Sequence, residues 1–381
     1  MIDAPPLLTD PGALAAHLAD LADLDPIGVD VERADADRYF RRAALIQVGG
    51  HGAAVLVDPL AIDDLSVLDA FLRERVVVLH AMENDLVPLA AAGVAPSRVE
   101  DTAVAAALLG LPTGLEPLLA EVLGLDGNGE KERMQRADWE ARPLDAAMRA
   151  YAAADVTDLP ELWEELADRL EAAGRRAWYD EELGALRAQP PIEERRDWSR
   201  VKGIGRLRDD ALGRAKALWR TREALARETD TAPGRILGDR TLVDLAEQPP
   251  TSVRELGRRG VRRQAVRRFG EDLVAALAGA PPSTPTRRAR RATEADRARA
   301  DRLRALRADV ADGLGLDPGV LCPSRVLLGA VLADPQTPEE LREALGLRSW
   351  QWRLLAEPFC EALDLDQAGT ASPDADDSDP A

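Results

Sequence analysis

Residues 27–32 read IGVDVE, a short apolar run that carries two acids, Asp30 and Glu32. Its β-branched residues and its length favour a β-strand. Successive side chains of a strand point to opposite faces, so these two acids leave the same face. Taken alone, the pair is better explained by an exposed strand end with two solvated acids. The apolar surround raises a second interpretation, because two charges on a buried strand are costly unless a cation or another partner compensates them.

The segments that follow this run predict a mixed sheet. Residues 44–48 and 53–57 are also strand-like, and three strands so close together suggest an antiparallel meander. An amphipathic helix over residues 65–73, a buried type of strand over 76–80 and a helix over 85–92 then give a β/α alternation. We therefore expect an α/β fold whose sheet contains both antiparallel and parallel strands.

Helical patterns dominate the chain beyond this alternation. Residues 104–123 predict helix with a break at 112–114, and a long helix is expected from 144 to 176, with an interruption possible at Pro160. Composition shifts to short arginine-rich helical stretches near residues 189–191, and an uncharged Pro-rich linker follows at 279–286.

Composition and charge narrow the classes of function. No apolar run of the 381 residues approaches the roughly 20 that cross a membrane, and the only cysteines are Cys322 and Cys360. We expect a soluble cytoplasmic protein without membrane contact. The net charge is −19, yet residues 195–310 hold 29 Lys+Arg against 16 Asp+Glu, or +13, leaving −32 elsewhere. An acidic domain with a basic appendage suits an enzyme of a polyanion; an arginine-rich solvated surface is an equally weighted alternative.

Two further acidic residues, each considered alone, are explained as ordinary polar residues of a helix. Asp85 follows the strand-like VVVL of residues 76–79 at the start of a helix, where an N-cap would explain it. Tyr151 and Asp155 are four apart on a predicted helix and therefore share a face, as surface side chains often do.

The order of these elements carries a specific resemblance. Asp30-x-Glu32, then His80 with Asp85 five residues later, then Tyr151 with Asp155 four later, resembles the three exonuclease motifs of the tyrosine-type DEDD superfamily. Position 150 is alanine, which disfavours the variant with a histidine there. Within the superfamily, the sequence is similar to the ribonuclease D family at five short motifs: ALIQV (44–48), LHA (79–81), DT (101–102), ADWEARPL (137–144) and YAAADV (151–156).

The resemblance implies a ribonuclease H-like fold and a metal-dependent 3′→5′ exoribonuclease that releases nucleoside monophosphates. It implies two divalent ions, Mg²⁺ or Mn²⁺, held by Asp30, Glu32, Asp85 and Asp155. Asp30 would be shared, Glu32 and Asp155 would support the ion that holds the water, and Asp85 would reach the second ion. Tyr151 would orient that water. The implied partner is RNA with a free 3′ end, such as a tRNA precursor, and we expect a monomer.

Three neighbouring positions have smaller expected roles. His80 is expected to pack at the end of its strand rather than act as a base. Asp101 is either a helix N-cap, which we favour, or a secondary contact near the site. Many relatives carry a lysine six residues before the aspartate of the Asp-Trp pair; here that place is Glu132, flanked by Lys131 and Arg133. Either a one-residue shift restores a phosphate contact or the contact is lost.

The arginine-rich part resembles a helicase-and-ribonuclease-D C-terminal (HRDC) module, a small helical bundle. The matching strings lie within 207–277, and residues 294–363 fit a divergent copy. We therefore expect an exonuclease domain over 1–190, helical domains over 200–279 and 287–366, and a disordered acidic tail over 367–381.

Two features of the helical part have competing interpretations. The basic cluster is expected either to hold phosphates or to be a solvated helix surface, whereas Trp350 and Trp352 are expected in a core. The cluster comprises Arg258, Arg259, Arg262, Arg263, Arg267 and Arg268.

Two other functions remain open at this point. A non-catalytic RNA-binding scaffold with a degenerate nuclease domain is disfavoured by retention of all four acids and Tyr151. A 3′→5′ DNA exonuclease is not separated from an RNA enzyme, since no reader of the ribose 2′-hydroxyl is identifiable.

Overall fold

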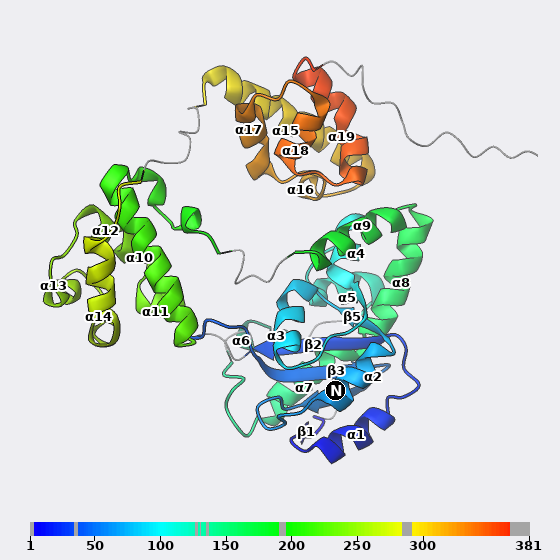
Figure 1. Cartoon of the computed structure of the whole chain (residues 1–381). Helices are drawn as coiled ribbons and strands as arrows, with labels where there is room; N and C mark the ends of the chain where they lie inside the picture. The colour runs from blue at the N-terminus through cyan, green and yellow to red at the C-terminus, as the bar shows by residue number, and fades with distance from the viewer. Residues whose placement is uncertain are drawn as a thin grey trace, which may run out of the picture. The chain divides into compact units, whose positions relative to one another are not determined.

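The computed structural model describes residues 4–33, 37–125, 129, 131–134, 137–189, 196–283 and 292–365. The chain divides into two compact units (Figure 1). The first takes in 1–102, 127–163 and 188–288, and the second takes in 103–126, 164–187 and 289–381. Each unit thus combines exonuclease segments with one set of helices. The expected domain boundaries remain a proposal, and the predicted tail over 367–381 lies outside the described residues.

The first unit contains a six-stranded sheet of order β1-β4-β3-β2-β5-β6. β2, β3 and β4 form the predicted antiparallel meander, whereas β5 runs parallel to β2 and β6 parallel to β5. The mixed sheet is confirmed; β1, parallel to β4, and β6 were not predicted. The strands are β1 Leu7–Leu8, β2 Ile27–Arg33, β3 Ala43–Gly50, β4 Ala53–Val57, β5 Val76–Leu79 and β6 Arg98–Asp101.

The helices before residue 190 are divided between the two units. They are α1 Pro11–Ala19, α2 Ser66–Arg73, α3 Leu86–Ala91, α4 Thr102–Leu109, α5 Leu115–Leu123, α6 Lys131–Met134, α7 Ala146–Thr157, α8 Leu159–Ala172 and α9 Arg176–Arg187, with a 3₁₀ turn, η1, at Met82–Asn84. The predicted break between residues 109 and 115 is confirmed. None of the helices formed by the described residues is long and apolar enough to cross a membrane.

The helical segment expected over 144–176 is interrupted close to Pro160, where an interruption was expected. α7 ends at Thr157, and α8 starts at Leu159 after Asp158, whose φ of −112° and ψ of 3° interrupt the helical path. Pro160 accounts for the break, because in a continuous helix its ring would clash with the carbonyl four residues earlier, whereas the first turn of α8 tolerates a residue without an N–H. The chain therefore turns directly after the segment that carries Asp155, and α8 leaves in a new direction.

Helix α7 packs unusually close to the sheet because glycines face it. A Cβ added at Gly28 on β2 would lie 2.6 Å from the Val156 carbonyl oxygen, and one at Gly49 on β3 would lie 3.1 Å from the Val156 side chain. Real Cβ atoms do not approach backbone oxygen so closely. The two glycines therefore let α7 bring its inner face down onto β2 and β3.

The remaining helices form two bundles, one in each unit. The first contains α10 Asp209–Glu228, α11 Pro233–Ile236, α12 Asp239–Glu247, α13 Val253–Arg258 and α14 Arg263–Ala278, after 3₁₀ turns η2 Trp198–Arg200 and η3 Ile204–Arg206. The second contains α15 Glu294–Leu314, α16 Pro318–Leu321, α17 Ser324–Ala333, α18 Pro338–Leu345 and α19 Ser349–Ala362. Tyr39, from the segment after β2, lies in the core of the first bundle together with Leu218 and Leu242.

In the second unit, α19 packs on α9. Trp350 is buried and stacks on Trp178 with ring centroids 4.7 Å apart. The carboxylate of Glu181 accepts hydrogen bonds from the backbone N–H groups of Ser349 and Trp350, which are otherwise unpaired donors at a helix start. The expectation of a core role is confirmed for Trp350; Trp352 is half-buried.

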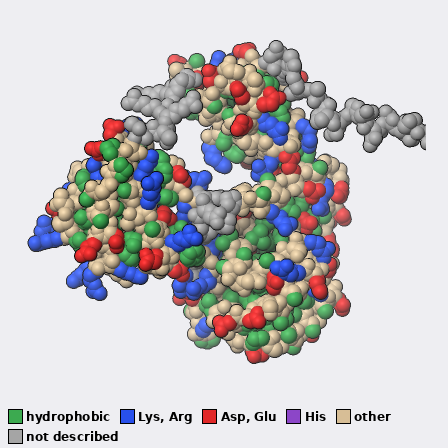
Figure 2. Space-filling view, in the orientation of Figure 1, with side chains coloured by type: hydrophobic (Ala, Val, Ile, Leu, Met, Phe, Trp, Pro, Cys, Tyr) green, Lys and Arg blue, Asp and Glu red, His purple; other side chains and the backbone are tan. Residues whose placement is uncertain are grey.

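The six arginines of the predicted basic cluster are exposed on α13, α14 and the turn between them. Figure 2 shows Lys and Arg side chains interspersed with acidic ones on the visible face of this first bundle. Phosphate binding by the cluster stays a prediction.

Substituting Gly28 tests the close approach of α7. Gly28→Ala is expected to destabilise the protein by about 1–3 kcal/mol, because the added methyl group meets a backbone oxygen that cannot move aside alone. The measurement is the thermal melting midpoint. Gly257→Ala in α13 is the matched control, since a Cβ there meets nothing within 4 Å. Equal midpoints for the two variants would contradict the close contact.

Candidate active site

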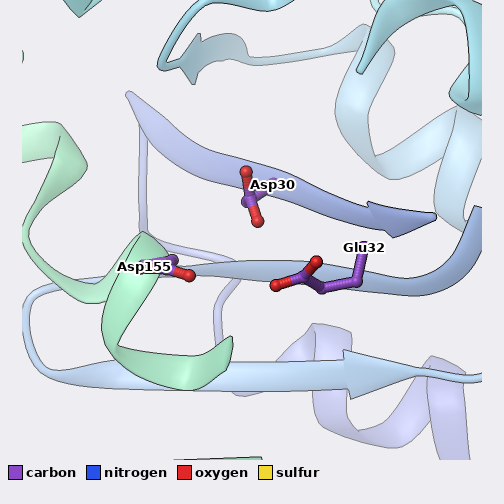
Figure 3. Close-up of side chains that lie close together, drawn as sticks. All are labelled: Asp30, Glu32 and Asp155. Carbon is purple, nitrogen blue, oxygen red and sulfur yellow. The ribbon is translucent and has the colours of Figure 1, made fainter. Parts of the chain in front are cut away.

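Three carboxylates converge where α7 crosses β2. Asp30 and Glu32 project from β2 and Asp155 from α7, and one oxygen of each lies within 4.8 Å of one oxygen of the others (Figure 3). The strand alternation places the first two on one face. The close approach of α7 supplies the third. Among the described residues this is the group of acidic, histidine or cysteine side chains able to hold a metal ion.

Asp85 lies beside this trio. Its side chain is buried at the end of η1, and its Oδ2 atom has no hydrogen-bond partner in the described part of the chain. Burial raises its pKa well above the usual range, and the charges of Asp30 and Asp101 raise it further. A buried carboxylate oxygen without a donor is costly. It therefore fits a position that faces a cation, although Asp85 is not within the 4.8 Å group.

The acids on β2 repel one another. Burial raises the pKa of Asp30 to about 6, against a hydrogen bond from the Val31 backbone that lowers it. Burial, followed by the charge of Asp30, raises the pKa of Glu32 to about 8, and Arg33 opposes this effect. A divalent cation between them would offset the cost of burying their charges and favour the ionised forms.

Gln47 is a site residue that the sequence analysis missed. It pairs with Asp30 in the β2–β3 register, so both side chains lie on the face toward α7. Its Nε2 donates to Asp30 Oδ2 at 3.3 Å, while its Oε1 is buried without a partner in the described structure. Its signal was visible in the sequence, because a glutamine in the run ALIQV places an amide in an apolar strand. An uncharged donor can orient Asp30 without neutralising it.

The turn that carries Asp85 is held by Asp101. Its carboxylate accepts hydrogen bonds from Ala81 N at 3.1 Å and Met82 N at 2.8 Å, and Ala81 adopts a left-handed φ of 63°. The secondary contact near the site, which the sequence analysis ranked below the helix cap, is thus present.

His80 packs at the end of β5, as expected. The Thr102 hydroxyl donates to the Leu79 carbonyl and lies 2.9 Å from His80 Nδ1, so that nitrogen is the donor to Thr102 Oγ1. The imidazole therefore belongs to the join between β5 and β6, and no structural feature makes it a base.

Tyr151 is half-buried one helical turn before Asp155. Its ring lies 6.4 Å from the ring of Trp139, centroid to centroid, at an angle of 39°. Trp139 is buried and donates from Nε1 to the Met134 carbonyl at 3.1 Å. The segment around Trp139 therefore lies on one side of the Tyr151 ring.

That segment is clamped to the sheet by Arg142. Its guanidinium donates to both oxygens of the buried Asp58, at 2.6 and 2.8 Å, and to the carbonyls of Ala44 and Trp139, each at 2.7 Å. A bidentate pair fixes orientation as well as distance. Arg142 therefore joins the end of β4, the start of β3 and the loop that carries Trp139.

The phosphate contact considered near position 132, where many relatives carry a lysine, remains a prediction. Lys131, Glu132 and Arg133 lie on α6, but the side chains of the first two are outside the described part, and Arg133 is exposed.

Comparison with protein families and with known proteins agrees with this geometry. A 3′→5′ exonuclease family model matches residues 7–171, and an HRDC domain model matches 211–277 and 296–363. Ribonuclease D of Sphingobium indicum is 33% identical over 288 residues, which are 73% of each chain. Ribonuclease D of Desulfotalea psychrophila is 28% identical over 319 residues, 80% of this chain and 84% of the relative.

Solved structures show the same arrangement of elements. The crystal structure of Escherichia coli RNase D, described as an exoribonuclease involved in structured RNA processing, matches with a TM-score of 0.76 and 25% identity over 94% of this chain and 98% of that one. A Bifidobacterium adolescentis protein matches in fold with a TM-score of 0.73 and 24% identity, over 96% of this chain and 99% of that one.

The contact between Arg142 and Asp58 predicts that one substitution at Asp58 strongly destabilises the protein. Asp58→Asn removes the negative partner of Arg142 at a buried position and is expected to destabilise the protein by on the order of 3 kcal/mol. The measurement is again the melting midpoint. Asp180→Asn, which breaks the exposed Arg176–Asp180 pair of α9, is the matched control and should cost less than about 1 kcal/mol. A clamp that contributes nothing would give both variants the same midpoint.

The raised pKa values predict how stability depends on pH. Because the fold favours the protonated carboxyls, Asp30 and Glu32 contribute fully to the stability of the folded state below their ordinary pKa values near 4. That contribution to stability is lost as pH rises through about 6 for Asp30 and about 8 for Glu32. In chelator, the melting temperature should fall across this range, and Mg²⁺ or Mn²⁺ should restore it more at the alkaline end. Glu32→Gln should flatten the fall, whereas the exposed Asp63→Asn should not. A cation effect that is independent of pH would refute this account.

Proposed function

Because this chain belongs to the ribonuclease D family of 3′→5′ exoribonucleases, we propose that Asp30, Glu32, Asp85 and Asp155 hold two divalent cations, Mg²⁺ or Mn²⁺, against the 3′-terminal phosphodiester. The observation that carries the proposal is the trio of carboxylate oxygens within 4.8 Å, with the unpartnered oxygen of Asp85 beside it. Oxygen ligands from carboxylates suit hard cations of this kind.

The donor set fits such ions. When bound, two cations would lower the pKa of the attacking water and neutralise charge that develops on the phosphate and on the leaving oxygen. Among the described residues, the group at this position consists of three carboxylates, with Asp85 beside it, and contains no cysteine or histidine, which disfavours zinc. Burial raises the pKa values of Asp30, Glu32 and Asp85, and neighbouring acids raise those of Glu32 and Asp85 further; positive charge at this position would offset both effects.

Each acid has a distinct position for its task. Asp30 lies at the centre, next to both Glu32 and Asp85 in the electrostatics of the site, and is the acid placed to be shared. Gln47 keeps one of its oxygens oriented by a hydrogen bond. Glu32 and Asp155 would then support the side of the attacking water, and Asp85 the side of the leaving group.

Tyr151 would orient the water. Its side chain shares one face of α7 with Asp155, and its ring lies near that of Trp139; both observations support this role. In-line attack of the water oxygen on phosphorus breaks the bond to the 3′-oxygen of the preceding nucleotide. The products are a nucleoside 5′-monophosphate and an RNA shortened by one residue, with a new 3′-hydroxyl.

The substrate that we propose is structured RNA with a free 3′ end, including tRNA precursors. The likeness over almost the whole chain to an exoribonuclease involved in structured RNA processing supports this class. The exposed arginines of α13 and α14 would contact the phosphates of such an RNA. We further propose that the protein acts as a monomer in the cytoplasm.

Asparagine substitutions test the site. Asp30→Asn and Asp155→Asn should each lower the rate of 3′-nucleotide release on the order of 10²–10³-fold, because each removes a charge that would balance the cations, while RNA affinity in Ca²⁺ changes little. The measurement is release of mononucleotides from 5′-labelled RNA in Mg²⁺, with a chelator as the blank. Asp63→Asn, at an exposed position, is the matched control.

Two results would count against the proposal. Full activity of either variant would exclude its aspartate from the site, and activity of the wild type in chelator would exclude the metals. A DNA strand of the same sequence, degraded faster than the RNA, would instead leave the site intact and overturn the substrate class.

A further inference from the structure

A pocket of about 430 Å³ lies in the first unit beside the acidic site. Two of the four large hydrophobic side chains that are exposed in the described structure belong to it: Phe40 and Leu60, 42% and 39% exposed. Both line this one pocket, together with Arg41 and Arg42. An aromatic ring next to two arginines is a combination that suits a base and its phosphate.

The segment that carries Phe40 is held in place by the first helical bundle. Asp230, at a left-handed φ of 42° after α10, accepts hydrogen bonds from Tyr39 N at 3.2 Å and Phe40 N at 3.1 Å. Its other oxygen accepts from Arg38 Nη1 at 3.2 Å. The charge of this aspartate is therefore balanced inside the contact, and the bundle fixes the backbone on which the aromatic ring stands.

The ring of Phe40 is itself oriented. Tyr39 is buried in the bundle core, and its ring meets that of Phe40 edge to face, with centroids 5.0 Å apart. The phenyl group is thus supported on one side and open on the other. An aromatic surface that is fixed before binding loses little entropy when a planar group stacks on it.

The two arginines differ in their constraints. Arg41 Nη1 donates to the Glu83 carbonyl at 3.2 Å, which ties the pocket to the turn that precedes Asp85. Arg42 reaches Asp230 only at 4.0 Å, and 46% of its side chain is exposed. Its guanidinium can therefore add a second anionic oxygen without leaving a buried position.

Two estimated distances place the pocket within the length of a few nucleotides from the acids. Ala43 lines it and pairs with Arg33, three strand positions from Asp30, or about 10 Å at about 3.3 Å per residue. Pro88 also lines it and lies three residues after Asp85, about 4.5 Å along α3. A stacked strand advances about 3.4 Å per nucleotide, so about 10 Å corresponds to two or three nucleotides.

We propose that this pocket binds an unpaired nucleotide of the substrate two or three positions before its 3′ end, with Phe40 stacking on the base and Arg42 contacting the phosphate. The assignment rests on the proposed function, because it takes the acid cluster as the place where the terminal nucleotide is cut. It gives the first bundle a role in substrate binding through Asp230, which lines the pocket and fixes the backbone of Phe40.

Substrate length tests the assignment. A dinucleotide is too short to reach from the acids into the pocket, whereas an unstructured decanucleotide spans both. Phe40→Ala should raise KM for the decanucleotide roughly 5- to 100-fold, the range of one base–aromatic stack, and leave kcat/KM for the dinucleotide unchanged. Phe40→Tyr keeps the ring and should restore the wild-type KM. Val67→Ala, at another exposed apolar side chain, is the matched control.

Salt dependence tests the arginine. Arg42→Gln should raise KM for the decanucleotide and lower the slope of log KM against log salt by about 0.7, the contribution of one phosphate contact on a single strand. Arg73→Gln, at a similarly exposed arginine with one acidic partner on α2, should leave the slope unchanged.

The outcomes separate this proposal from the one before it. Equal losses on both lengths would show that Phe40 only supports the fold, and no loss on either would place the pocket outside the path of the RNA; both results overturn the proposal. Absence of metal-dependent release by the wild type at every length would defeat the proposed function instead. Tighter binding of an apolar peptide than of RNA by the same pocket would also overturn the assignment.

Discussion

The crowding of half-buried carboxylates is the constraint on which the rest of this structure depends. Oxygens of Asp30, Glu32 and Asp155 lie within 4.8 Å of one another. Desolvation raises the pKa of Asp30 and Glu32, and the charge of Asp30 raises that of Glu32 further. Acids placed so close would separate if their backbones were free to move. The fold must therefore hold them from elements that are fixed by other interactions.

Those interactions are distributed around the site rather than within it. Gly28 and Gly49 allow α7 to lie on the sheet, and the Arg142–Asp58 pair fixes the loop against which Tyr151 rests. Asp101 holds the turn before Asp85 through two backbone N–H groups. Each contact is made by a residue that does not meet the proposed cations, so each can stabilise the arrangement without competing for them. Rigid supports of this kind are what a preorganised site requires.

The helical bundles also hold parts of the nuclease in place. Asp230 of the first bundle fixes the backbone of the segment that follows β2, the strand that carries Asp30 and Glu32. A helical domain can in this way contribute to the nuclease without supplying a side chain to the chemistry. In the second unit, Glu181 on α9 holds the start of α19, so the second bundle is joined to exonuclease helices by a comparably specific contact.

The sequence by itself determined the local features: the strands β2 to β5, the mixed sheet, the shared face of Asp30 and Glu32, and the order of the acids that marks the family. These follow from periodicity and spacing, which are properties of neighbouring residues. β1 escaped because two residues carry no pattern, and β6 because its sequence RVED lacks the apolar run that marks β5; the interruption expected at Pro160 lies two residues earlier, at Asp158.

Only the tertiary structure decided which distant groups meet. The hydrogen bond from Gln47 to Asp30, the approach of α7, the clamp of Arg142 on Asp58 and the contact of Asp230 with residues 39 and 40 join positions from 17 to 191 residues apart. No local pattern encodes such contacts, since they depend on how whole elements pack. The four acids could be named in advance because their order resembles a known family; the convergence of Asp30, Glu32 and Asp155 is a property of the packed sheet and helix.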